Sequence, residues 1–129
     1  MDWLNSSSIV ILNKSMDALW QRERVIADNI ANATTPGYKR KVLSFEEELA
    51  QKLDNVRFKA NKREVRDAIA ETKFIVAEDN KTTMNVDGNN VELDEEYLLL
   101  METAKQYEYA ERLLSDKFNR LRYAIKGGQ

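Results

Sequence analysis

The chain has 129 residues, and 33% of them are charged, yet its formal net charge is only −2. This length fits one domain or an elongated pair of elements, and the balanced charge gives no support for a partner of strong opposite charge such as nucleic acid. The sequence contains neither Cys nor His, which excludes disulfides and thiolate nucleophiles and removes the commonest general base and metal ligand.

The N-terminal stretch MDWLNSSSIVILNKS has no basic region, and its longest apolar run is IVIL. A cleaved secretion signal needs a basic region followed by a longer apolar run, so we expect no such signal here. No segment of the chain approaches the ~20 consecutive apolar residues that cross a bilayer. We therefore expect a protein made in the cytoplasm with no membrane span. The lack of Cys and His leads us to expect no catalytic site, no metal and no cofactor.

The segment 1–34 predicts one long helix, organised over residues 5–33. Its apolar residues recur at alternating steps of three and four, the spacing of a coiled-coil seam. The seam consists of Ile9, Leu12, Met16, Leu19, Ile26, Ile30 and Ala33, and Glu23 interrupts it.

The middle segment 35–93 starts with a turn and is less regular. Thr35-Pro36-Gly37-Tyr38 fits a type II turn, with Pro at the second position and Gly at the third. SFEEELAQKL predicts a short helix, REVRDAIAETKFIVAEDN is ambiguous between helix and strand, and TMNVDGNNVEL alternates around an Asp-Gly turn signal. The basic run at 57–66 predicts a solvated surface rather than a nucleic-acid site, because acidic residues surround it and Phe58 is its only aromatic residue.

The segment 94–129 predicts a second long helix over residues 94–126, with Asp94 as its N-cap and Gly127 as its stop. Its seam again alternates in steps of three and four, and Glu111 interrupts it. The seam residues are Tyr97, Leu100, Ala104, Tyr107, Leu114, Phe118, Leu121 and Ile125.

Together these patterns predict one mainly α domain. Its terminal helices, each roughly 45–50 Å long, pair as an antiparallel coiled coil around a short, irregular and partly β middle segment. We expect Glu23 and Glu111 to specify the register of the helices or to pair with nearby bases (Arg22, Arg24 or Arg112) rather than to act in catalysis. Further apolar residues lie off the seams and predict contacts with the middle segment or with other subunits: Val10, Ile11, Trp20, Val25, Leu98, Met101, Tyr109 and Leu113.

Two amides, Asn29 and Asn32, precede the predicted turn. In the last turn of a helix they can bond the free carbonyls there, or they can reach a neighbouring chain. The residues alone leave both possibilities open.

The string LWQRERVIADNIANATTPGYKR resembles the N-terminal signature of the bacterial flagellar axial proteins, the rod and hook family. The matching residues are Leu19, Arg24, Ala27, Asn29, Ile30, Ala31, Asn32, Thr35, Pro36, Gly37 and Tyr38. NNVELDEEYLLLMETAKQYEYA is similar to the C-terminal motif of the family at Asn90, Val91, Glu92, Glu96, Met101, Gln106 and Tyr107. The short chain, the segment after the turn and the FNRLRYAIKGGQ tail resemble the subunits of the proximal rod.

The resemblance implies a structural subunit of the flagellar rod that is exported unfolded by the flagellar type III apparatus and assembles through its terminal helices. The implied assembly seam is Leu12, Met16, Leu19, Ile26, Ile30, Leu100, Tyr107, Leu114, Phe118 and Leu121. The implied partners are other rod subunits, the membrane-ring protein, the export-gate proteins and a rod adaptor protein. Phe45 and Leu49 resemble the export-gate motif of such subunits, although an ordinary amphipathic helix gives the same pattern.

Two alternatives stay open at this point. Another short flagellar rod protein would share the resemblance. A cytoplasmic helical adaptor or chaperone would show the same two seams.

Overall fold

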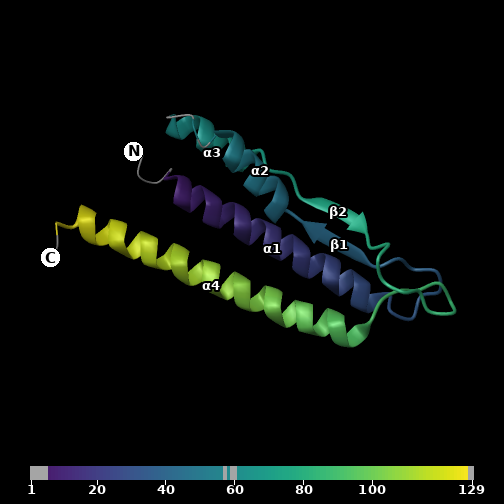
Figure 1. Cartoon of the computed structure of the whole chain (residues 1–129). Coiled ribbons are helices and arrows are strands. Elements are labelled where there is room, and N and C mark those ends of the chain that lie inside the picture. Colours follow the sequence, from purple (N-terminus) through teal and green to yellow (C-terminus); the bar gives the residue numbers. More distant parts are fainter. Residues whose placement is uncertain (1–5, 57, 59–60, 128–129) are drawn as a thin grey trace.

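The computed structural model describes residues 6–56, 58 and 61–127. The elements follow the order α1 (Ser7–Ala31), β1 (Lys41–Ser44), α2 (Glu46–Val56), α3 (Lys62–Ala70), β2 (Ile75–Glu78) and α4 (Leu93–Ile125). The two long helices lie side by side and run in opposite directions, while the strands and the two short helices lie along the other side of α1 (Figure 1). The predicted mainly α fold with long terminal helices and a partly β middle is confirmed.

The ends of the long helices follow the local sequence closely. α1 stops at Ala31, just before the Thr-Thr-Pro-Gly stretch, and Gly127 ends α4 with a φ of 70°. The predicted N-cap of α4 is wrong, because Glu92 occupies that position and Asp94 lies in the first turn. A carboxylate there still stabilises the helix, since it faces the positive end of the helix dipole.

The middle segment resolves the ambiguous patterns. The first short helix forms as expected, while REVRDAIAETKFIVAEDN divides into α3 and β2. β2 pairs antiparallel with β1, a strand that the sequence patterns did not indicate, and Leu43 lies opposite Val76. The alternating stretch around Asp87 forms no strand; it is a loop in which the Gly88 N–H donates to the Asn85 carbonyl over 2.9 Å.

A small apolar core lies between α1 and the middle segment. Ala18, Leu43 and Phe45 are buried in it, and Val25, Leu49 and Phe74 cover it as half-buried neighbours. The rings of Phe45 and Phe74 meet edge to face with centroids 6.5 Å apart. This cluster attaches the strands to α1, so β1 is held in a fixed position beside the helix pair.

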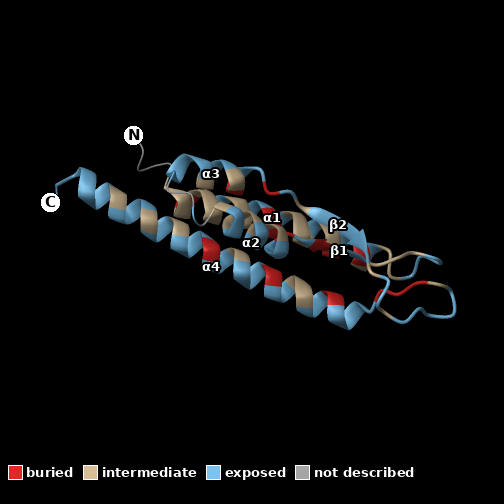
Figure 2. Ribbon diagram, turned by 45° about the horizontal axis from the view of Figure 1, so that its top comes forward, coloured by how far each residue is buried: buried red, intermediate tan, exposed pale blue. Residues whose placement is uncertain are grey.

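α4 carries much less of the buried surface than α1 does. Figure 2 shows buried and half-buried positions recurring along α4, with exposed positions between them. The residues that are not fully exposed fall at Glu96, Leu99, Leu100, Thr103, Tyr107, Ala110, Leu114, Lys117 and Leu121. Half of the predicted α4 seam, the row that contains Leu100 and Tyr107, therefore lies on the buried side of the helix.

The other predicted row of the α4 seam does not face α1. Tyr97, Ala104, Glu111, Phe118 and Ile125 are exposed, and the buried row lies one residue earlier. A straight helix drifts away from a strict heptad repeat, and small residues such as Thr103 and Ala110 allow α1 to approach closely on that side. A contact of Phe118 with a neighbouring subunit stays a prediction.

The seam of α1 faces inward along its length. Ile9, Leu19 and Ile26 are buried, and Leu12, Met16 and Ile30 are half-buried. Within the described ranges, no helix has both the length and the apolar character needed to cross a membrane.

Candidate functional site

The turn at residues 35–38 has the predicted geometry. The Tyr38 N–H donates to the Thr35 carbonyl over 3.2 Å, and Gly37 has a φ of 73°. Only glycine adopts this backbone readily, and the third position of a type II turn requires it. The turn directs the chain away from the axis of α1 and into β1.

Asn29 joins the end of α1 to three other segments. Its Nδ2 donates to the Lys41 carbonyl over 2.8 Å and to Glu96 Oε2 over 3.1 Å. Its Oδ1 accepts from the Lys41 N–H over 2.9 Å and from the Tyr38 hydroxyl over 3.2 Å. Since Asn29 is only 1% exposed, its amide is committed to contacts within the chain rather than to a neighbouring subunit.

Asn32 has a different and more local role. Its Nδ2 donates to the Asp28 carbonyl over 2.8 Å, and its Oδ1 accepts from the Thr35 hydroxyl over 3.2 Å. These bonds satisfy a free carbonyl of the last helical turn and connect it to the start of the turn. Asn32 is thus a helix-end residue, and Asn29 is a tertiary one.

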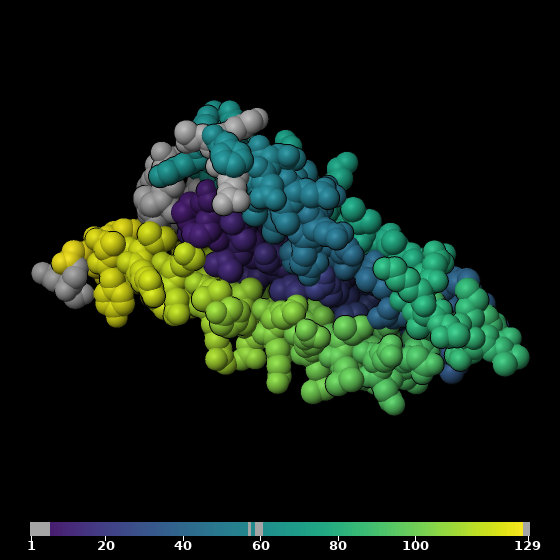
Figure 3. Space-filling model, in the orientation of Figure 1, coloured from purple at the N-terminus to yellow at the C-terminus, as the bar shows by residue number. Residues whose placement is uncertain are grey.

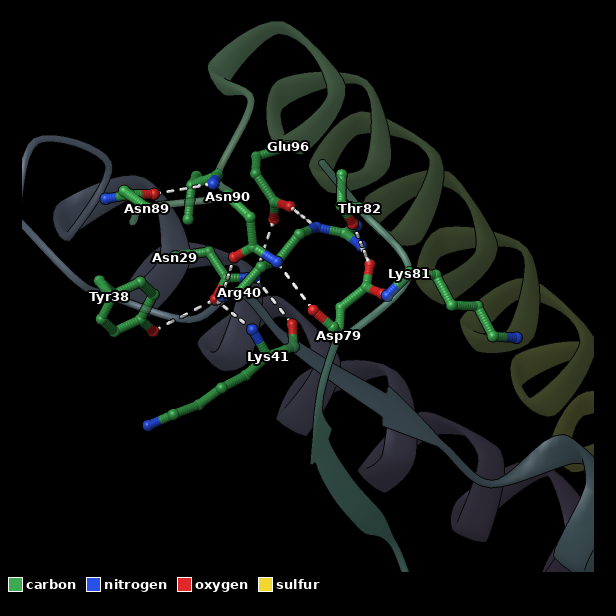
Figure 4. Close-up of polar contacts among 11 residues, drawn as sticks. Asn29, Tyr38, Arg40, Lys41, Asp79, Lys81, Thr82, Asn89, Asn90 and Glu96 are labelled. Atoms are coloured by element: carbon green, nitrogen blue, oxygen red, sulfur yellow. Dashed lines mark hydrogen bonds and ion pairs between the residues drawn. The ribbon is translucent and has the colours of Figure 1, made fainter. Parts of the chain in front are cut away.

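Arg40 lies between two carboxylates, as Figure 4 shows. Its Nε donates to Glu96 in an ion pair, and its Nη1 lies 2.7 Å from Asp79 Oδ2. The Glu96 side chain is 0% exposed and that of Arg40 is 13% exposed. Because each charge of this buried group has an opposite partner, it connects the start of α4 to both strands.

Asp79 is further stabilised as a carboxylate by two neighbours. The Thr82 hydroxyl donates to it over 2.6 Å and the Lys81 N–H over 2.9 Å. Together with Arg40, these bonds lower the pKa of Asp79 to about 2. The group is therefore ionised throughout the physiological pH range.

Two adjacent asparagines before α4 complete the cluster. The Asn89 Nδ2 lies 2.9, 3.1 and 2.8 Å from the carbonyls of Asn32, Ala33 and Thr35, so it caps the end of α1 from a distant segment. The Asn90 Oδ1 accepts from the Arg40 N–H over 2.6 Å, and its Nδ2 donates to the Asp79 carbonyl over 2.7 Å. We call the set Asn29, Tyr38, Arg40, Asp79, Asn89, Asn90 and Glu96 the polar junction.

The polar junction is a hydrogen-bonded cluster that ties distant segments together. Among the residues that the structure describes, no buried side-chain nitrogen or oxygen lacks a hydrogen-bond partner, and no group of three or more acidic side chains is placed to hold a metal ion. The buried polar atoms of the junction are occupied by contacts within the chain, so the cluster fixes the relative positions of α1, α4 and the strands.

The structure brings only part of the predicted site residues together. Asn29 and Tyr38 enter the polar junction, whereas Ala31, Thr35, Pro36 and Gly37 lie exposed at the end of α1. The seam residues are distributed along the helix pair. Phe45 is 6% exposed and belongs to the apolar core, with Leu49 half-buried beside it.

The predicted ion pairs of the seam glutamates are wrong. Arg22 pairs with Glu46 at 2.6 Å, and Arg112 pairs with Glu108. Arg24 stacks on the Trp20 ring at 5.2 Å. Local spacing misled the prediction for Arg22, because its partner comes from α2, a distant segment.

The sequence patterns missed Arg40, Asp79 and Asn89. One signal was present for Asp79, because an aspartate followed three residues later by Thr82 is typical of a side-chain-capped turn. No local signal marks Arg40, since its partners lie 39 and 56 residues away. In the basic run, Arg57, Lys59 and Ala60 lie outside the described residues, as do residues 1–5 of the predicted N-terminal segment 1–34.

Comparison with known proteins agrees with the motifs at both ends of the chain. The family described as "Flagella basal body rod protein" matches residues 16–39. The flagellar basal body rod protein FlgB of Bacillus subtilis is 29% identical over 127 residues, which are 98% of each chain. The FlgB of Borreliella burgdorferi is 30% identical, over 92% of this chain and 96% of its own.

A third relative, the FlgB of Cereibacter sphaeroides, is 32% identical over 82% of this chain and 84% of its own. The similarity thus includes both long helices and the polar junction between them. The chain belongs to the family of flagellar basal body rod proteins FlgB, which are structural proteins and not enzymes.

Proposed function

We propose that this structural protein of the flagellar basal body rod is a subunit of the proximal rod, which leaves the cytoplasm unfolded and assembles through its terminal helices. The observation that carries the proposal is the similarity to FlgB over nearly the whole chain. It is supported by the many exposed apolar residues of α4, which a protein that functions alone has no reason to expose. The exposed apolar residues there include Tyr97, Leu98, Met101, Tyr109, Leu113, Phe118, Tyr123 and Ile125.

The polar junction gives such a subunit a defined shape. Asn29 and Arg40 connect the helix pair to the strands through buried bonds, and the turn at Gly37 directs the chain between them. A subunit that repeats in a regular assembly must present its surfaces at fixed angles. We infer that the N-terminal motif serves this purpose, with Asn29 as the buried tie and residues 35–37 as the exposed bend.

The proposed assembly seam uses the helices in two ways. Its buried members, such as Leu19 and Ile26, hold α1 in place within the subunit. Its exposed member Phe118 is 40% exposed and available to a neighbour. The other proposed partners are the membrane-ring protein, the export-gate proteins and the rod adaptor protein, as the family resemblance implies.

In the proposed export-gate motif, Phe45 is buried in the folded chain and Leu49 is half-buried. Phe45 packs in the core with Leu43 and Ala18. A gate could therefore read the motif only before the chain folds, which agrees with export of an unfolded subunit.

The chain offers a matched control for this motif. Phe45→Ala and Leu43→Ala both remove a buried side chain from the same core and should destabilise the folded protein by about 2–5 kcal/mol. If Phe45 is an export signal, only Phe45→Ala lowers secretion into the medium. Equal secretion of the two variants would leave Phe45 as a core residue alone.

The proposed function as a whole is tested by locating a tagged full chain in purified basal bodies and by complementing a strain that lacks its own FlgB. We expect the tag at the base of the rod and restored swimming. A chain found only in the cytoplasm would support the adaptor or chaperone alternative. A chain found in the rod that fails to complement would support another short rod protein.

A further inference from the structure

The helix pair has two separate apolar flanks. Ala110 of α4 faces α1. With 3.6 residues per turn, Phe118 and Ile125 lie on one side of Ala110 around the helix, and Tyr109 and Leu113 lie on the other side. The first flank, which carries Phe118, continues onto α1. Trp20 of α1 and Leu114 of α4 line one hollow there, and Leu114 and Phe118 line the adjoining groove. We call this first flank the Trp20 flank.

The second flank lies on the side of the helix pair that carries β1. It consists of Leu98, Tyr109 and Leu113, which are 68%, 65% and 37% exposed. Glu102, one turn from Leu98, lines a cleft with Arg22 and β1, which places this Tyr109 flank on the opposite side from Trp20. Figure 3 shows α4, coloured green to yellow, along one edge of the molecule, with its C-terminal part extending beyond α1.

Each flank has the composition of an interface. Trp20 is 50% exposed and Tyr109 is 65% exposed, and Trp and Tyr are enriched at the centres of protein contacts. The Trp20 flank is hollowed, with a groove of about 600 Å³ between Glu111 and Lys126, whereas the side chains of the Tyr109 flank stand out from a single helix. The groove of the Trp20 flank can therefore receive the projecting side chains of the Tyr109 flank.

The two flanks can also form one ion pair and one hydrogen bond in register. Asp17 and Arg24 lie seven residues apart on the exposed side of α1, and Glu102 and Tyr109 lie seven residues apart on α4. Both spacings equal roughly 10 Å along a helix. When α4 of one copy runs antiparallel to α1 of another, Arg24 meets Glu102 and Asp17 meets the Tyr109 hydroxyl.

We propose that the Tyr109 flank of one copy packs into the Trp20 flank of the next copy, so that a single contact repeats head to tail. The two flanks are different surfaces, so the contact is not self-complementary and does not close as a twofold dimer. Since α1 and α4 are antiparallel within the chain, this packing keeps all copies pointing the same way. The inference rests on the proposed rod function and specifies the surface by which identical subunits meet.

The absence of Cys from the chain makes a cross-linking test clean. We would express the full chain as Arg24→Cys/Glu102→Cys in cells that build rods from it, and oxidise purified basal bodies. The two positions lie on opposite flanks of one chain, so a disulfide between them must join two copies. A ladder of covalent multimers is the expected result.

Single variants provide the decisive comparison. Arg24→Cys alone and Glu102→Cys alone should stay monomeric, and the two expressed together should give dimers but no longer species. A dimer from either single variant would mean a symmetric contact and would overturn the proposal. Arg24→Cys/Val86→Cys is the control, because Val86 is also exposed but lies on a loop away from both flanks, and it should give no ladder.

The outcome separates this inference from the proposed function. Variant chains that are present in basal bodies but form no ladder would exclude the flank contact and leave the rod function intact. Absence of the Cys-free parent from basal bodies would instead count against the rod function. If the first pair of substitutions is excluded from rods, Asp17→Cys/Tyr109→Cys tests the same contact two turns along.

Discussion

Asn29 Nδ2 donates a 3.1 Å hydrogen bond to Glu96 Oε2, although the two residues are 67 positions apart in the chain. Both side chains are buried, and the same Glu96 carboxylate also forms an ion pair with Arg40 Nε. This contact connects the last turn of α1 to the first turn of α4. It explains why an asparagine stands where a helix would otherwise favour an apolar residue.

The two asparagines of the N-terminal motif should differ sharply when replaced by leucine. Asn29→Leu removes the partners of Lys41, Tyr38 and Glu96 and leaves buried polar groups unsatisfied, so we expect a loss of about 3 kcal/mol in the free energy of unfolding. Asn32→Leu removes only local bonds at an accessible helix end and improves helix propensity, so we expect a change within about 0.5 kcal/mol. Urea unfolding of the two variants measures the difference, and similar values for both would contradict the separate roles.

The buried ion pair should matter far more than an exposed one. Arg40→Met leaves Glu96 buried with no cation beside it, and we expect a loss of about 3–5 kcal/mol. Arg112→Met breaks the exposed pair with Glu108 on α4 and should cost no more than about 0.5 kcal/mol. Chemical denaturation compares the two, and an equally small effect for Arg40 would show that the junction does not hold the helices.

The lowered pKa of Asp79 predicts a dependence of stability on acid. Because the folded-state pKa of about 2 lies below the ordinary value of 3.8, the contribution is complete above pH 3.8 and is lost as the pH falls toward 2. After allowance for solvent screening we expect about 1 kcal/mol from this group. The stability difference between the wild type and Asp79→Asn should therefore shrink between pH 5 and pH 2; a difference that is constant over this range would exclude the linkage.

The turn glycine should affect assembly more than folding. Gly37 has a φ of 73°, and a Cβ built there meets nothing within 4 Å, so Gly37→Val suffers backbone strain of ~1–2 kcal/mol without a steric clash. We expect a folded chain with a normal α1 and fewer completed rods, as scored by circular dichroism and by electron microscopy of basal bodies. Normal rods from this variant would mean that the angle of the turn is not needed in assembly.

A charge in the α1 seam should prevent rod formation without preventing export. Leu19 is 6% exposed, and Leu19→Asp introduces a buried charge that costs several kcal/mol. We expect secretion of the unfolded chain and no rods, whereas Val86→Asp on the exposed loop should leave both unchanged. Swimming cells that carry Leu19→Asp would refute the proposed packing.

The sequence by itself determined the elements whose cause is local. The steps of three and four predicted both long helices, and Pro36 with Gly37 predicted the type II turn, because helix periodicity and backbone restriction act over a few residues. The absence of Cys and His, together with the resemblance of both termini to the axial proteins, favours a structural role.

Tertiary structure alone decided which residues meet. It placed the buried row of α4 at Thr103 and Ala110, where small side chains allow close packing, and it left Phe118 exposed. It also assembled Arg40, Asp79 and Glu96 from three segments into one ion cluster. No local pattern marks such a cluster, because the free energy that stabilises it comes from desolvated charges paired across long loops, and this energy exists only once the chain has folded.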